Sequence, residues 1–224
     1  MSRESIDPSV AAADVVGYAR RLVDLGQLPW FGGNNSIRLD DDRLLITKTS
    51  LLGGREGDAQ TVVTGIDADD DATPWASSAL PIHRAIYRTT GAQAIVHAHP
   101  YHATLLTFFR DAIEPIDENG LIYLGPRVEV VAAPKRNAWN LVAEELAAGL
   151  ASSRVVMLKW HGSFAIGDTI GEAMHQARAV EDAARFIVDV PRMATYLGPP
   201  AMPPADAAAE IGGDGTRVIL PGGR

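Results

Sequence analysis

The stretch AIVHAHPYHATLL, residues 94–106, determines the architecture that we expect for this chain. Residues 94–99 form an apolar run that ends at a proline, which is typical of a strand, and a helix is predicted over residues 100–109. Side chains two apart in a strand point to the same face. His97 and His99 can therefore converge on one ion.

A second apolar run, residues 155–160, predicts another strand that is buried on both faces, and His161 follows it directly. Imidazole nitrogen is a good zinc ligand, and a catalytic zinc commonly keeps three protein ligands and one open position. An H-x-H pair alone is a weak signal, because unrelated histidines also alternate along strands. His161 strengthens it, since functional residues concentrate where buried elements end.

Strands and helices alternate along the rest of the chain, which favours a single α/β domain. The composition changes at Pro191 to Pro, Gly and Ala. We therefore expect a domain over residues 1–190 and a tail over 191–224. Residues 111–135 are predicted to form short strands and turns. Further helices are predicted over residues 8–25, 78–88, 138–150 and 169–188. The expected N-caps are Asp7 for the first, Ser77 or Ser78 for the second, and Thr169 with Glu172 for the last.

Composition excludes several classes of protein. The 224 residues contain no cysteine, which excludes disulfides, thiolate metal sites and a cysteine nucleophile. The net charge of −8 argues against nucleic-acid partners. No stretch is long and apolar enough to span a membrane, and the N-terminus does not resemble a signal peptide. We expect a cytoplasmic protein without nucleic-acid or membrane partners.

Three short segments are rich in small polar residues and suit an anion. They are GGNNS (32–36), TKTS (47–50) and the paired serines Ser77 and Ser78. Backbone N–H groups, hydroxyls and a helix N-terminus can together hold a phosphate or a carboxylate. Each segment alone is more often an ordinary turn or cap. The candidate metal trio makes their combination harder to dismiss.

These residues resemble the class II aldolase/adducin family, and its fuculose phosphate aldolases most of all. The matching stretches lie within residues 10–190 and are GGNNSIRL (32–39), LLITKTS (44–50), SSALPIHRAIY (77–87), AIVHAHPYHATLL (94–106) and residues 155–187. The resemblance implies a three-layer α/β/α fold around a mostly antiparallel sheet. It also implies a homo-oligomer, a tetramer, with active sites between subunits.

By this resemblance, His97, His99 and His161 hold Zn²⁺ or another divalent ion such as Mn²⁺, Co²⁺ or Fe²⁺. The residues that match positions holding a small phosphorylated or carboxylated substrate are Gly33, Asn34, Thr49, Ser50, Ser77 and Ser78.

The departure from the family is Ala79. The aldolases carry an acid/base glutamate directly after the paired serines, and alanine can neither move a proton nor bind a metal. Another group can replace it, with His102 and Tyr123 as the leading candidates beside Asp117 and Glu118. The chain also has Lys48 in its second polar loop, which is either an anion-binding cation or a solvated lysine.

The leading hypothesis is a metal-dependent carbon–carbon lyase that cleaves a fuculose-1-phosphate-like sugar phosphate through a metal-stabilised enediolate. A decarboxylase of an oxo-acid phosphate or of a dihydroxyaromatic acid is the alternative, because loss of CO2 needs no hydroxyl proton to be removed. Two further alternatives stay open. The first is that Ala79 is a substitution introduced to block turnover. The second is that the protein keeps this fold as a non-catalytic scaffold.

Overall fold

A computed structural model describes residues 5–29, 32–49, 60–135 and 137–201. Its centre is an eight-stranded sheet in the order β3-β2-β1-β4-β8-β7-β6-β5. Neighbouring strands are antiparallel except β6 and β7, which are parallel, so the sheet is mixed. The strands are β1 (Asn34–Arg38), β2 (Arg43–Thr47), β3 (Thr61–Gly65), β4 (Ala94–Ala98), β5 (Ala112–Ile113), β6 (Val128–Val131), β7 (Val155–Leu158) and β8 (Gly162–Gly167).

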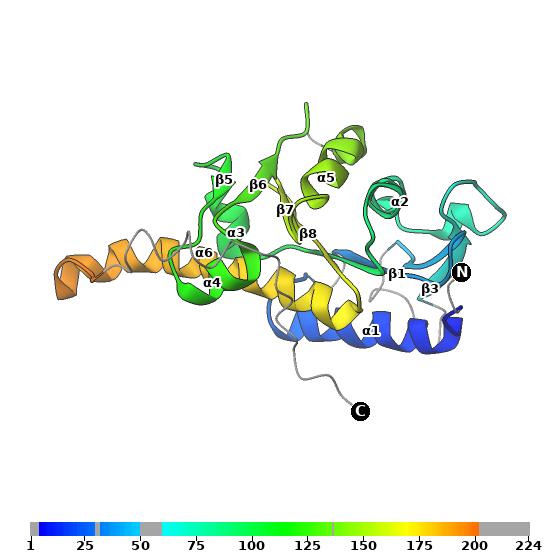
Figure 1. Ribbon diagram of the computed structural model, residues 1–224, viewed down its shortest axis with the longest axis horizontal. Helices are drawn as coiled ribbons and strands as arrows, with labels where there is room; N and C mark the ends of the chain where they lie inside the picture. The colour runs from blue at the N-terminus through cyan, green and yellow to red at the C-terminus, as the bar shows by residue number, and fades with distance from the viewer. Residues whose placement is uncertain (1–4, 30–31, 50–59, 136, 202–224) are drawn as a thin grey trace.

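Helices cover both faces of this sheet (Figure 1). The α-helices are α1 (Pro8–Asp24), α2 (Leu80–Thr89), α3 (Tyr101–Leu106), α4 (Glu118–Leu124), α5 (Ala143–Leu150) and α6 (Ile170–Leu197), and 3₁₀ turns span Thr73–Trp75 and Trp139–Val142. No helix in the described part of the chain is long and apolar enough to cross a membrane.

Strand alternation divides the hydrophobic core in two. Val96 of β4 packs in the cluster that holds α1 and α6, whereas its neighbour Ile95 packs in the cluster that holds α2 and α5. Both side chains are fully buried, because successive residues of a strand point to opposite faces. The predicted α/β fold class is confirmed.

Two predicted helix starts are confirmed by their caps. The carboxylate of Asp7 accepts a hydrogen bond from the backbone N–H of Ser9 at 2.7 Å. At the start of α6, the Thr169 hydroxyl accepts from the backbone N–H of Glu172 at 3.1 Å. Such caps satisfy backbone donors that have no partner inside the helix.

Other boundaries differ from the expectation. Helix α6 continues beyond the predicted end at residue 188 and passes through Pro191 to Leu197. Proline there loses one backbone hydrogen bond, but its fixed φ is still helical. Helix α4 lies where short strands and turns were expected. The Asp117 carboxylate caps α4 by accepting a hydrogen bond from the backbone N–H of Gly120. This helix is hard to predict because it is short and contains a glycine, which disfavours helix.

Candidate metal centre

The three histidines lie at adjoining ends of β4 and β8, two neighbouring strands in the middle of the sheet. His97 lies on β4, and His99 follows the last residue of that strand. His161 directly precedes β8, which pairs antiparallel with β4. Among the described residues, these three form the group whose ligand atoms could share a metal ion, all lying within 4.8 Å of one another.

Two of the three pairs of ring nitrogens have the spacing that a bound metal would require. The Nε2 atom of His97 lies 3.1 Å from Nε2 of His99 and 3.2 Å from Nε2 of His161. Tetrahedral zinc with bonds of about 2.0–2.1 Å places its ligand nitrogens roughly 3.3 Å apart. The three side chains therefore fit a divalent metal.

The protonation state of His97 also suits a ligand. Its Nδ1–H donates to the backbone carbonyl of Ser163 at 2.9 Å, which leaves the Nε2 lone pair facing the other two rings. Burial holds the pKa of His97 well below its usual value, and neighbouring His99 and His161 lower it further. Burial also lowers the pKa of His99 to about 4 and lowers that of His161. Neutral imidazole is the form that binds a metal.

The turn between β7 and β8 positions His161. Trp160 has φ +63°, a left-handed conformation that is rare for a bulky residue, and its backbone N–H donates to the Thr107 hydroxyl at 2.8 Å. The His161 N–H donates to the Leu158 carbonyl at 3.1 Å, which closes the turn. A side chain at Gly162 would collide with the Ala98 carbonyl and the His99 ring, so glycine is required there.

A cavity of about 170 Å³ opens over the histidines. Six of the lining residues, which we call the polar wall, are Gly33, Asn34, Lys48, Thr49, Ser77 and Ser78. The lining also includes apolar side chains, among them Trp139, Leu158 and Phe164. The lining residues are Gly33, Asn34, Lys48, Thr49, Ser77, Ser78, Ala79, His97, His99, Trp139, Leu158, His161 and Phe164.

The polar wall unites segments that are far apart in sequence. The backbone N–H of Ser77 donates to the Thr47 carbonyl at 2.9 Å, and Lys48 forms a β-bridge with Ala76. These contacts bring Thr49 beside the paired serines. All the substrate-binding candidates within the described residues line the cavity, and Ser50 lies outside the described residues.

Ala79 occupies the N-cap position of α2 and is 4% exposed. The expected side-chain cap from Ser77 or Ser78 is wrong, because α2 begins at Leu80 and has no side-chain cap. Instead, the Ser77 hydroxyl accepts from the Ala79 N–H at 3.3 Å. Ala79 lines the cavity directly after the paired serines, where the family resemblance places the carboxylate.

His102 does not line this cavity. Its Nδ1 atom lies 2.7 Å from a carboxylate oxygen of Glu181 on α6. The other oxygen of Glu181 accepts from the backbone N–H groups of His102 and Ala103 at 2.9 and 3.0 Å. Glu181 therefore holds the start of α3 against α6, and His102 belongs to that contact.

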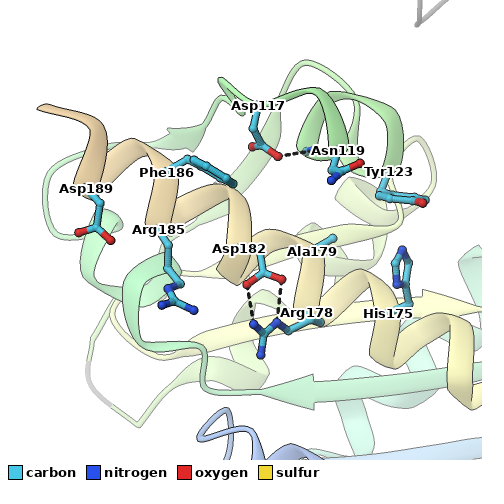
Figure 2. Close-up of a pocket in the computed structure, with 11 residues that line it drawn as sticks. Asp117, Asn119, Tyr123, His175, Arg178, Ala179, Asp182, Arg185, Phe186 and Asp189 are labelled. Carbon is cyan, nitrogen blue, oxygen red and sulfur yellow. Dashed lines mark hydrogen bonds and ion pairs between the residues drawn. The ribbon is translucent and has the colours of Figure 1, made fainter. Parts of the chain in front are cut away.

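Tyr123 lies in a separate groove between α4 and α6, of about 620 Å³. Figure 2 shows its ring beside His175, and the ring centroids lie 4.4 Å apart. Asp117, another proposed replacement for the missing carboxylate, borders the same groove. Glu118 begins α4 and lines neither hollow. Within one chain, the structure does not bring these candidates to the histidines.

The sequence reasoning missed the aromatic residues of the site. Trp139 falls in the helix predicted over residues 138–150, but it lies in a 3₁₀ turn, and its ring centroid lies 5.4 Å from that of His161. Phe164 stacks on His97 at 4.2 Å because the two residues are register partners on β4 and β8. Phe164 could be located only from the pairing of β4 with β8. Trp139 begins the 3₁₀ turn before α5, and no sequence motif marks it as a residue of the site.

The geometry agrees with comparisons to known proteins. Residues 13–188 match the family model of the class II aldolase and adducin N-terminal domain. The chain belongs to this family. It is 26% identical over 178 residues to a 3-oxo-tetronate 4-phosphate decarboxylase of Haemophilus influenzae, covering 77% of this chain and 84% of that protein.

Two other family members carry different names. A 3,4-dihydroxyphthalate decarboxylase of Terrabacter sp. is 28% identical over 195 residues, covering 81% of this chain and 79% of that protein. The crystal structure of L-fuculose-1-phosphate aldolase from Thermus thermophilus superimposes with a TM-score of 0.73 at 29% identity, covering 84% of this chain and 98% of that one. The family therefore includes both decarboxylases and aldolases, which makes a lyase the supported class of activity.

Proposed function

We propose that this chain is a divalent-metal-dependent decarboxylase of a small anionic oxo acid. The observation that carries the proposal is the composition of the histidine cavity. Among its described lining residues there is no aspartate or glutamate, and an alanine stands beside the paired serines. A cavity with neutral histidines, a lysine and several hydroxyls suits a substrate that brings its own negative charge.

Decarboxylation requires less proton transfer than aldol cleavage. Aldol cleavage must remove a hydroxyl proton, and losing a positioned base typically costs about 10²–10⁴-fold in rate. In decarboxylation of a 3-oxo acid, the bond between the carboxylate carbon and carbon 2 breaks and CO2 leaves. The electron pair of that bond passes through carbon 2 to the carbonyl oxygen on carbon 3. A proton from water then adds to carbon 2 and restores the carbonyl group. The first of these steps needs no base at position 79.

The proposed roles of the residues follow their positions. His97, His99 and His161 hold the metal, which when bound supplies Lewis-acid stabilisation of negative charge on the substrate oxygen. The anionic end of the substrate is held by Gly33, Asn34, Lys48 and the hydroxyls of Thr49, Ser77 and Ser78. We include Ser50 because it directly follows Thr49 in the sequence. The decarboxylase relatives support this proposal, since oxo acids with a phosphate group carry the required charges.

An aldolase acting on a fuculose-1-phosphate-like substrate is the second candidate. The Thermus thermophilus aldolase favours it, because this chain covers 98% of that structure at 29% identity. The missing base must then come from elsewhere. His102 and Tyr123 lie away from the histidines of their own chain, so they qualify only from a neighbouring subunit of the proposed homotetramer. We also retain a cytoplasmic location as part of the proposal.

The test uses purified protein loaded with zinc or manganese, with a His97→Ala variant as the control. Release of CO2 from 3-oxo-tetronate 4-phosphate or a dihydroxyphthalate, without an aldehyde product, is the expected result. Formation of an aldehyde and a ketone phosphate from L-fuculose 1-phosphate would favour the aldolase instead. A metal-loaded protein that turns over none of these substrates would contradict both and favour a non-catalytic scaffold.

A further inference from the structure

A row of buried polar groups lies behind the polar wall of the cavity. The Oδ1 atom of Asn34 lies 2.6 Å from Nε2 of His83, and Nδ1 of His83 lies 2.7 Å from the Ser36 hydroxyl. The Ser36 hydroxyl lies 2.8 Å from that of Tyr87. Only Asn34, the first member of this row, lines the cavity.

Strand and helix periodicity align the four side chains. Asn34 and Ser36 are two residues apart on β1 and share its face toward α2, while His83 and Tyr87 are four apart on one side of α2. His83 and Ser36 are fully buried, and Tyr87 is 2% exposed. These groups must therefore satisfy one another, because an unpaired buried polar group is costly.

The Tyr87 hydroxyl determines which group donates and which accepts in each hydrogen bond of this row. Burial raises the pKa of Tyr87, so its hydroxyl keeps the proton. Within the described residues, the hydroxyl's hydrogen-bond partner is Ser36, which must accept that proton. The Ser36 hydroxyl then donates to Nδ1 of His83. The reverse order would leave the Tyr87 proton without an acceptor in the part of the chain that the structure describes.

His83 transmits this direction to the cavity. With Nδ1 accepting from Ser36, the single ring proton of neutral His83 lies on Nε2 and is donated to Oδ1 of Asn34. Burial lowers the pKa of His83 to about 3, so the ring stays neutral near physiological pH. The carboxamide NH2 group of Asn34 is then left to face the cavity.

We infer that His83 is a positioning residue that locks the Asn34 carboxamide with its NH2 group toward the substrate, so that this wall donates to an anion and rejects a cation. The inference rests on the proposed function in one respect, namely that the cavity holds the substrate. It goes further by assigning the polarity of the wall to residues outside the cavity.

The first test measures the His83 tautomer directly, by ¹⁵N NMR of the zinc-loaded full chain. We expect the proton on Nε2 in the native protein. Ser36→Ala removes the donor to Nδ1 and should produce a mixture of tautomers. Tyr87→Phe removes the hydroxyl that donates to Ser36 and should also produce a mixture of tautomers. His175→Ala, in the groove between α4 and α6, is the control in which the His83 tautomer should not change. A native His83 protonated on Nδ1 would overturn the inference.

The second test measures binding of inorganic phosphate to the same zinc-loaded proteins by titration calorimetry. Ser36→Ala should weaken phosphate binding about tenfold, the effect of one poorly oriented hydrogen bond to a charged group, while the zinc content stays unchanged. Equal phosphate affinity in Ser36→Ala and the native protein would show that His83 serves the core alone. Neither test requires turnover, so failure of the decarboxylase assay would leave the inference standing.

Discussion

The Nδ1 atom of His97 lies 2.9 Å from the carbonyl oxygen of Ser163, across the β4–β8 pair. This bond fixes the ring before any metal binds, because the backbone of β8 cannot move without breaking the centre of the sheet. A ligand held this way loses little rotational freedom on metal binding. The sheet itself, rather than a flexible loop, thus prepares the first ligand of the site.

His97→Ala should abolish metal binding. We expect the native chain to carry about one divalent ion, the stoichiometry of a single three-histidine site, and the variant to carry almost none. Metal analysis of protein freed of chelator measures both. His175→Ala is a matched control, because that histidine lies in the groove between α4 and α6 and should leave the metal content unchanged. Retention of the ion by His97→Ala would contradict the assignment.

The convergence of His97 and His99 could be predicted from sequence because it depends on a local rule, the alternation of side chains along an extended segment. The apolar run before His161 is β7, which does not pair with β4. His161 reaches the other two histidines because it directly precedes β8, an unpredicted strand that lies between β4 and β7. His102 and Tyr123 could not be placed in this way, since their positions depend on how α3 and α4 dock on α6. The orientation of Asn34 depends on the pairing of β1 with α2, which no local pattern records.

Ala79→Glu should create aldolase activity if the scaffold lacks only its base. The new carboxylate would stand beside Ser77 and Ser78 at the edge of the cavity. We expect cleavage of L-fuculose 1-phosphate to rise by about 10²–10⁴-fold, the usual contribution of a positioned base. Decarboxylation should fall, because the added negative charge repels an anionic substrate. A coupled aldehyde assay and CO2 release measure the two activities.

The control for this substitution is Ala79→Gln, which adds similar volume without a group that transfers protons. It should lower decarboxylation by crowding the cavity and should gain no aldolase activity. Equal aldolase gains in the glutamate and glutamine variants would show that filling the cavity, and not proton transfer, is responsible. No gain in either would place the catalytic base of the aldolase candidate elsewhere.

The buried His83 should make the protein sensitive to acid. Its folded pKa is lowered from 6.5 to about 3, so the unfolded chain takes up a proton that the folded chain refuses. The stability that this difference contributes is complete above pH 6.5 and is lost as the pH falls from 6.5 toward 3. The loss is up to about 1.4 kcal/mol for each pH unit.

Denaturant unfolding of the native protein and of His83→Gln at pH 7, 6, 5 and 4 measures this effect. Glutamine does not titrate, so the variant should start less stable and lose less of its free energy of unfolding on acidification. Acid also protonates carboxylates and so lowers the free energy of unfolding, but these groups are common to both proteins and their effect cancels in the comparison. Parallel pH profiles would contradict burial of a neutral His83.

Gly33→Ala should damage both stability and metal binding. Gly33 has φ +75°, and a Cβ there would lie 2.7 Å from the His97 carbonyl oxygen and would also collide with Leu28. The substitution therefore adds backbone strain and pushes β4 at the first metal ligand. We expect a loss of about 1–3 kcal/mol in the free energy of unfolding, together with weaker zinc binding.

Gly26→Ala separates these two effects. Gly26 has a similar left-handed φ of +68°, but no atom lies within 4 Å of an added Cβ. That variant should show only the cost of the backbone conformation, roughly 1 kcal/mol, and should bind zinc as the native protein does. If Gly33→Ala behaved like Gly26→Ala in denaturant unfolding and zinc titration, the close approach of Gly33 to the His97 backbone would have no role in the site. A larger loss confined to Gly33→Ala would mean that this loop and the metal ligand share one tightly packed junction.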